Sequence, residues 1–236
     1  VADLTTPMRS AARFLAPWLH HSLFWLPHSR ALRKAAAACE VLALSGLTHH
    51  RPPFNIDTVD TPSGTCAVTE EAVFRTPFCS LLRFRKTPAC GTEPKVLLVA
   101  PVSGHFATLL RGTVQTLLQD HDVYVTDWHN VRDIPLSEGA FDLDTFIEHI
   151  IRFVDWLGPH THLVAVCQPT VPTLAAVAVM AEDQHPHQPR SMTLMAGPID
   201  CRINPTEVNN LATAKPMEWF ESKLIGVVPL RYKGGM

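Results

Sequence analysis

Buried-strand patterns and helical patterns alternate along the second half of the chain. Continuous apolar runs, which are typical of strands covered on both faces, are found at residues 95–102, 122–127, 161–166 and 191–196. Stretches with helical periodicity or strong helix formers separate these runs, at residues 108–118, 143–157 and 169–181. Strands that alternate with helices form parallel sheets covered by those helices. The pattern therefore predicts an α/β fold with a largely parallel sheet.

The first third of the chain lacks this alternation and predicts a separate helical region. Residues 7–48 are expected to be helical, with strong helix formers at residues 31–45. Residues 49–63 contain three prolines and are expected to form a linker. We therefore place an N-terminal helical region and its linker at residues 1–63. Two further strand candidates follow the linker, at residues 66–74 and 79–86.

Composition and charge exclude several classes of protein. Of the 236 residues, 46% are hydrophobic and 18% are charged, which excludes a disordered chain. The formal net charge of −2 gives no electrostatic footprint for nucleic acid, and no apolar run approaches the roughly 18 residues of a transmembrane segment. The six cysteines show no CxxC spacing, which favours reduced thiols and a cytoplasmic protein. Neither metal-ligand spacing nor a Gly-rich phosphate loop is present, so we expect no metal and no cofactor.

The strand-to-helix junction at residues 165–169 has the pattern of a nucleophile elbow. Such an elbow needs a strand, a sharp turn carrying Ser or Cys, and a helix, with small residues two positions before and after the nucleophile. Ala165 is small, and Pro169 replaces the usual glycine at a helix start that tolerates proline. Cys167 would then face a helix N-terminus, whose dipole favours the nucleophilic thiolate. A buried cysteine that fills space at a strand end fits the pattern equally well, so both interpretations stay open.

Polar residues near the ends of other strands are candidates for the rest of a site, since carboxyl ends of parallel strands meet at one edge. In folds with such an elbow, one oxyanion N–H comes from the residue after the nucleophile, here Gln168. The other comes from an early loop, here around Gly104 and His105. A structural role is favoured over base catalysis for His105, because the catalytic histidine of such folds comes last in the chain. Ser103 and Asp127 are candidates for support, with turn capping favoured for Asp127.

Four long strings of the sequence carry a family resemblance: KVLLVAPVSGHFATLLRGTV, DHDVYVTDWHNVRDIPLSEGAFDLDTFIEHI, HLVAVCQPTVPTLAAVA and PRSMTLMAGPIDCRINPTEVN. They closely resemble the intracellular polyhydroxyalkanoate (poly-3-hydroxybutyrate) depolymerases, over essentially the whole chain. The resemblance implies an α/β-hydrolase fold with Cys167 as the nucleophile in place of serine. It also implies hydrolysis of ester bonds in the storage polyester to 3-hydroxybutyrate or its oligomers, by a cytoplasmic enzyme at the surface of polymer granules.

The chain departs from that family in the second half of the catalytic order, which runs nucleophile, acid, histidine. His185 and His187 are the only histidines after the elbow and lie where this fold has no catalytic histidine, so Asp200 has none to orient. We therefore expect an N-terminal part of such an enzyme, inactive alone, without the C-terminal strands and part of the lid. Its later domains would be an incomplete α/β-hydrolase core at residues 64–204 and the start of a lid at residues 205–236.

Two other functions stay open at this point. A polyhydroxyalkanoate synthase-like acyltransferase also uses a cysteine on this fold, but its elbow usually keeps glycines where this chain has Ala165 and Pro169. A non-catalytic granule-binding protein that lost the catalytic residues would explain the missing histidine. For Arg111 and Arg132 we expect pairing at the surface rather than contact with polymer.

Overall fold

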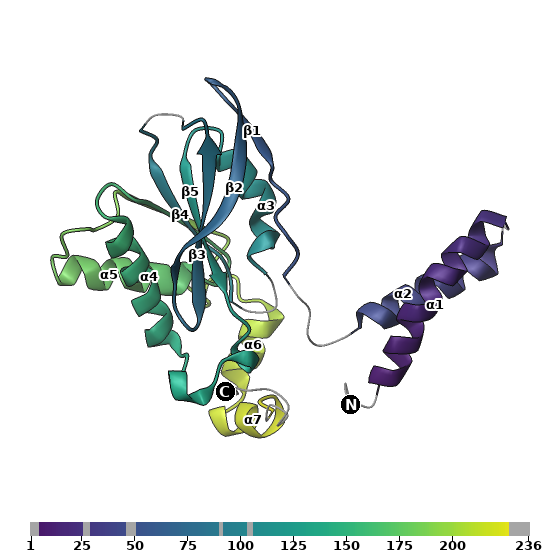
Figure 1. Cartoon of the computed structure of the whole chain (residues 1–236). Helices are drawn as coiled ribbons and strands as arrows, with labels where there is room; N and C mark the ends of the chain where they lie inside the picture. The colour runs from purple at the N-terminus through teal and green to yellow at the C-terminus, as the bar shows by residue number, and fades with distance from the viewer. Residues whose placement is uncertain (1–4, 26–28, 46–50, 90–91, 103–105, 227–236) are drawn as a thin grey trace. The chain divides into compact units, whose positions relative to one another are not determined.

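The chain consists of two compact units, Val1–Arg51 and Pro52–Met236. The structure is a computed structural model that describes residues 5–25, 29–45, 51–89, 92–102 and 106–226 (Figure 1). The boundary between the units falls after Arg51, earlier than the domain boundary expected at residue 63. Within the described ranges, no helix is both long enough and apolar enough to cross a bilayer.

The first unit is a pair of helices, α1 (Thr6–Trp25) and α2 (Arg30–Leu44). The hydroxyl of Ser29 caps α2, because it accepts a hydrogen bond from the Leu32 N–H at 3.3 Å. The two helices pack through small side chains. Their buried alanines are Ala12, Ala16, Ala36 and Ala43.

The second unit is built on a seven-stranded mixed sheet with the strand order β1-β2-β3-β5-β4-β6-β7. Four adjacent strands, β5, β4, β6 and β7, are parallel to one another. The remaining pairs, β1–β2, β2–β3 and β3–β5, are antiparallel. The strands are β1 (Thr58–Thr61), β2 (Gly64–Arg75), β3 (Cys79–Thr87), β4 (Lys95–Val99), β5 (Asp122–Trp128), β6 (His162–Val166) and β7 (Ser191–Met195).

Helices cover both faces of this sheet and create two hydrophobic cores (Figure 1). One core lies between the sheet and α3, and the other lies between the sheet and helices α4 and α5. Leu98 of β4 faces the first core, and its neighbours Leu97 and Val99 face the second, which explains the continuous apolar run of this strand. The helices are α3 (Arg111–Leu117), α4 (Leu143–Leu157) and α5 (Thr170–Glu182), followed after β7 by α6 (Glu207–Ala214) and α7 (Met217–Lys223).

This architecture confirms the predicted fold class, an α/β-hydrolase fold with a mostly parallel sheet flanked by helices. The sheet is more mixed than the alternation indicated, because β3 pairs antiparallel with β5. One prediction was wrong: residues 58–61, expected within the linker, form strand β1. Val59 is buried there, and β-branched residues such as Thr58 favour the extended conformation that pairs with β2.

His149 on α4 is the buried histidine of the second core. Its Nδ1–H donates to the Thr145 carbonyl at 2.7 Å, and its Nε2 lies 3.1 Å from the Thr76 hydroxyl. The rings of Phe78, Phe141 and Phe153 surround it, each with a centroid distance of 6.0 Å. Burial lowers the pKa of His149, so the folded protein holds the ring neutral.

We expect this ring to make stability depend on pH. Because the folded-state pKa of His149 lies below the unfolded value of about 6.5, the unfolded chain takes up the proton first as the pH falls. The stabilising contribution is complete above pH ~6.5 and is lost toward the lowered folded pKa. Urea unfolding at pH 7.5 and pH 5 should show that the stability gap between wild type and His149→Asn narrows in acid. A gap of constant size would contradict this account.

Candidate active site

The carboxyl ends of β4 and β6 lie side by side where the connections of the sheet diverge. β4 leads to α3 on one face, whereas β6 leads to α5 on the opposite face. In open α/β sheets, ligands bind outside the carboxyl ends of strands at such a switch point. The segments that follow β4 and β6 therefore define the candidate active site.

Cys167 occupies the sharp turn between β6 and α5, within residues 165–169, which we call the elbow. It has a φ of 69°, in the left-handed region, and α5 begins three residues later at Thr170. That conformation costs a residue with a side chain about 1–2 kcal/mol, so the surroundings must hold it. Ala165 and Pro169 are buried, whereas Cys167 and Gln168 are exposed. The cysteine is therefore presented to solvent at the carboxyl edge of the sheet.

Hydrogen bonds from α5 and β7 hold the elbow. The Cys167 N–H donates to the Met195 carbonyl at 2.8 Å, so this N–H is engaged and is not an oxyanion donor. The Cys167 carbonyl accepts from the N–H and the hydroxyl of Thr170, at 3.2 Å and 2.8 Å. Gly197, just after β7, lies against the same threonine, since a Cβ at Gly197 would be 1.6 Å from Thr170 Oγ1. The elbow is thus locked between the start of α5 and the end of β7.

Side chains from β5 and from the elbow fix the chain that leaves β4. The N–H of Ala100 donates to Thr126 Oγ1 at 2.9 Å, and its carbonyl accepts from Trp128 Nε1 at 2.9 Å. These bonds satisfy Ala100 beyond the last paired residues of β4 and β5. The N–H of Val102 donates to Gln168 Oε1 at 3.0 Å, which joins the segments after β4 and β6 directly.

We expect Thr126→Val to destabilise the protein by about 1–3 kcal/mol, because the fully buried N–H of Ala100 loses its acceptor. Thr126→Ser is the matched control: it keeps the hydroxyl and removes one methyl group, which costs about 0.8 kcal/mol. Urea unfolding of both variants measures the difference. Equal losses in the two variants would show that the hydrogen bond contributes little.

The other candidate residues are placed only in part. Three of them, Ser103, Gly104 and His105, lie outside the described residues, and their expected roles stay predictions. Asp127 is half-buried at the end of β5, opposite Ser80 of β3. Burial, and to a smaller degree the charge of Asp127, raises the pKa of the buried Cys79 thiol. Asp127 thus shares the carboxyl edge with the elbow, and its supporting role stays a prediction.

The acid and the histidines that follow the elbow in sequence have other partners. His187 Nδ1 and His185 Nε2 lie 2.9 Å and 3.5 Å from Asp155 Oδ1, in the connection that enters the amino end of β7. Asp200 accepts two hydrogen bonds from the Arg202 guanidinium at 2.8 Å each, which lowers the pKa of its carboxyl group. Within the part of the chain that the structure describes, no histidine hydrogen-bonds to the elbow thiol.

An apolar groove of about 530 Å³ lies beside the loop that follows β5. Its lining includes Phe78, Ile134, Leu136 and Phe141. Because this loop leaves the carboxyl end of β5, the groove belongs to the same edge of the sheet as the elbow. Arg111 does not take part: its guanidinium binds the carbonyl of Phe54 and, at 2.7 Å, the carbonyl of Asn55.

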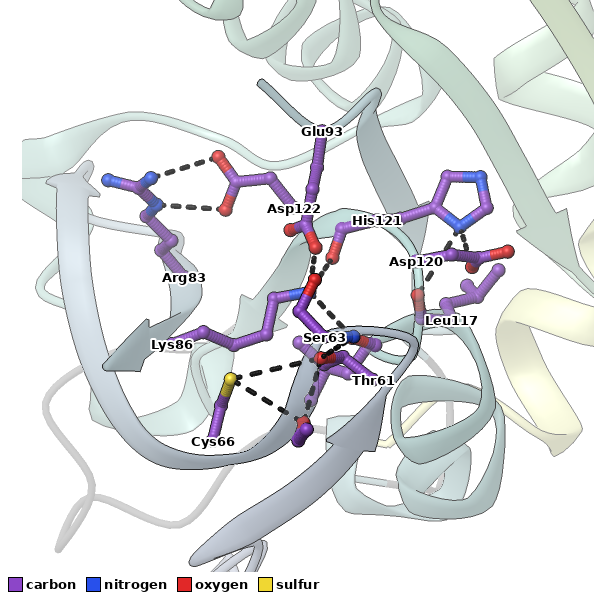
Figure 2. Close-up of polar contacts among 12 residues, drawn as sticks. Thr61, Ser63, Cys66, Arg83, Lys86, Glu93, Leu117, Asp120, His121 and Asp122 are labelled. Carbon is purple, nitrogen blue, oxygen red and sulfur yellow. Dashed lines mark hydrogen bonds and ion pairs between the residues drawn. The ribbon is translucent and has the colours of Figure 1, made fainter. Parts of the chain in front are cut away.

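The amino edge of the sheet carries a network of paired charges instead (Figure 2). Arg83 makes two hydrogen bonds of 3.0 Å to Asp122, and Lys86 Nζ lies 2.6 Å from Glu93 Oε1. The Lys86 side chain is only 4% exposed, so this pairing compensates a buried charge. No group of three or more His, Cys, Asp or Glu side chains among the residues with described positions could hold a metal ion.

The sequence did not predict the roles of three supporting residues. Thr126 and Trp128 hold the segment that follows β4, and Gly197 lies against Thr170 beside the elbow. Gly197 carried a signal, since a Gly-Pro pair directly follows a strand whose carboxyl end belongs to the edge that holds the elbow. Thr126 and Trp128 carried none, because their partner Ala100 is 26 and 28 residues away in the sequence.

Solved structures of several hydrolases resemble this chain. An esterase from Rhizomucor miehei matches with 11% identity over 62% of this chain and 48% of that chain, with a TM-score of 0.46. LAE6, an α/β hydrolase from the metagenome of Lake Arreo, matches with 14% identity over 73% and 58%, with a TM-score of 0.43. An N-formylmaleamic acid deformylase from Pseudomonas putida matches with 18% identity over 56% and 48%, with a TM-score of 0.41.

The chain spans about half the length of these solved structures. No match was found among curated protein sequences. Residues 196–236 match a family model described as the PHB de-polymerase C-terminus. This segment begins directly after β7 and contains α6 and α7. Because this segment matches the family's own model, the resemblance to the poly-3-hydroxybutyrate depolymerase family is confirmed over residues 196–236.

Proposed function

We propose that this chain carries the nucleophile of a polyhydroxyalkanoate depolymerase, an ester hydrolase that acts on poly-3-hydroxybutyrate at the surface of polymer granules in the cytoplasm. The observation that supports this most directly is the exposed Cys167 at a left-handed turn between a buried strand and a helix. The family match immediately after β7 supports the polyester as the substrate.

In the proposed mechanism, the Cys167 thiolate attacks a carbonyl carbon of the polyester. A bond forms between Sγ and that carbon, and the ester C–O bond breaks, so that the shortened polymer leaves as an alcohol after taking up a proton. Water then hydrolyses the thioester, releases the hydroxy acid and restores the thiol. Gln168 follows the nucleophile, at the position that supplies an oxyanion N–H in this fold, and the second donor is assigned to Gly104 or His105.

The surroundings of Cys167 favour this role over a structural one. A space-filling cysteine is buried, as Cys79 is, and needs no strained backbone. Cys167 is exposed in a costly conformation that hydrogen bonds to Met195 and Thr170 maintain. The apolar groove beside β5 offers a surface for the aliphatic polyester at the same edge of the sheet.

Peptide mapping after incubation with p-nitrophenyl 3-hydroxybutyrate tests the proposed nucleophile. We expect the acyl group on Cys167 in preference to Cys201, which is also exposed and serves as an internal control. Acylation of Cys201 without acylation of Cys167 would refute the proposal. Because no histidine bonds to the elbow thiol in the described residues, we expect one acyl group per chain rather than rapid turnover.

The acceptor of the acyl group separates hydrolase from acyltransferase. With amorphous poly-3-hydroxybutyrate as the substrate of the enzyme that contains this chain, a depolymerase releases soluble hydroxy acid. With 3-hydroxybutyryl-CoA, a synthase-like acyltransferase instead lengthens a hydroxyl-terminated polymer. Polymer growth without release of hydroxy acid would show that the transferase interpretation is correct, and absence of both reactions would support a non-catalytic granule-binding protein.

A further inference from the structure

The two units of the chain carry opposite net charges. Val1–Arg51 has six Lys and Arg residues against two Asp and Glu residues, which gives +4. Pro52–Met236 has 14 against 20, which gives −6. The net charge of −2 for the whole chain conceals this separation. Charge asymmetry of this kind points to a charged partner for the first unit.

Large apolar side chains form an exposed stripe along α1. Met8, Phe14, Leu15 and Trp18 are 60%, 72%, 49% and 66% exposed. Residues three, four and seven positions apart share one side of a helix, so these four side chains lie along one stripe. The stripe borders the buried alanines that face α2.

Polar contacts between the two helices lie on the opposite side of α1. His20 Nε2 is 2.6 Å from Glu40 Oε1, and Arg13 Nε donates to the Ala43 carbonyl at 3.3 Å. At 3.6 residues per turn, Arg13 and His20 point roughly opposite to Leu15 and Trp18. The bridge to Glu40 therefore marks the side of the hairpin that carries the polar groups.

α2 continues the same division. Arg33 lies seven residues before Glu40 and thus on the polar side, where Arg30 and Lys34 flank it. The other side of α2 carries only apolar residues, at Ala31, Ala35, Ala38 and Leu42. The hairpin thus has an apolar face, made by these four residues with Met8, Phe14, Leu15 and Trp18, and a cationic face, made by Arg9, Arg13, Arg30, Arg33 and Lys34.

We propose that the apolar face of this hairpin docks on an anionic lipid surface, with the helices lying in the plane of the interface. Helices that bind membranes in this way carry Trp, Phe and Leu on one face and Lys and Arg on the other. The charge of +4 is complementary to anionic headgroups, and it disfavours a second copy of the hairpin as the partner, because the two copies would repel each other.

Vesicle flotation of the full chain tests this docking. We expect binding to phosphatidylglycerol vesicles at least about tenfold stronger than to phosphatidylcholine vesicles, and weaker binding at high salt. Phe14→Gln with Leu15→Gln should reduce binding to phosphatidylglycerol about tenfold or more, because two exposed side chains of the apolar face are lost.

Val41→Gln with Leu44→Gln is the matched control. These residues are 70% and 68% exposed but lie on the cationic side of α2, near Glu40. This variant should bind vesicles as the wild type does, and circular dichroism should show equal helicity in both variants.

Three results would overturn the inference: no flotation of the wild type, equal binding to both lipids, or equal impairment of both variants. Sedimentation of the same proteins tests the alternative partner, which is a second copy of the chain. If the wild type self-associates and Phe14→Gln with Leu15→Gln makes it monomeric without any lipid binding, the apolar face joins copies of the chain, and the lipid proposal is wrong. The assay needs no ester hydrolysis, so its outcome is separate from that of the proposed function.

Discussion

Cys167→Ala will abolish acylation of the chain at the elbow and will lower the rate of p-nitrophenol release from the activated ester by more than about 100-fold relative to the wild type. The reason is geometric: of the two exposed cysteines among the described residues, only Cys167 has a left-handed φ, in a sharp turn that leads directly from a strand into a helix. Intact-mass spectra and product release after mixing measure the two effects.

Cys201→Ala is the control for this prediction. Cys201 is also exposed, and its thiol contacts the Pro198 carbonyl at 3.7 Å rather than a helix start. Its replacement should leave acylation unchanged. If Cys201→Ala lowers the rate as much as Cys167→Ala does, the reaction reflects general thiol exposure and the elbow has no special reactivity.

Gly197→Ala will lower the free energy of unfolding by about 1–3 kcal/mol, the usual cost of inserting a methyl group into packed surroundings. The new Cβ would lie 1.6 Å from Oγ1, 2.4 Å from Cβ and 2.5 Å from Cγ2 of Thr170, so this side chain must move. The movement breaks the 2.8 Å hydrogen bond from Thr170 to the Cys167 carbonyl. We therefore expect slower acylation together with the loss of stability.

Gly112→Ala is the matched control. Gly112 lies within α3, and no atom would be within 4 Å of its added Cβ. Because alanine favours helix over glycine, this variant should gain about 0.5–1 kcal/mol and acylate at the normal rate. Urea unfolding and ester labelling of both variants distinguish the cases. An unchanged free energy of unfolding in Gly197→Ala would contradict this prediction, because it would show that the loop after β7 moves away from Thr170 without destabilising the protein.

Local patterns were sufficient to predict most elements of the second unit. The prediction for α4 matches the structure at both ends, because Asp142 caps its start and Gly158, with a φ of 76°, ends it. The position of Cys167 between strand and helix followed in the same way from the switch of β pattern to helix pattern. Such signals are contained within a few residues, which a single sequence displays.

Long-range pairing could not be predicted in this way. The antiparallel contact between β3 and β5 joins residues about 45 positions apart. The sequence of neither strand indicates which other strand it pairs with. The same holds for the bond from Val102 to Gln168, which assembles the candidate site from two loops 66 residues apart. β1 was missed because its four residues are surrounded by prolines and its burial depends on the neighbouring strand.

The separation of charge between the two units has a consequence for handling the protein. The isoelectric point near 6.7 describes a weakly charged chain as a whole, but the chain consists of a positive part and a negative part. In dilute buffer, the positive part of one molecule attracts the negative part of another over distances of tens of ångströms. Added salt shortens this range to about 10 Å at 0.1 M, so solubility should rise, rather than fall, as salt is first added.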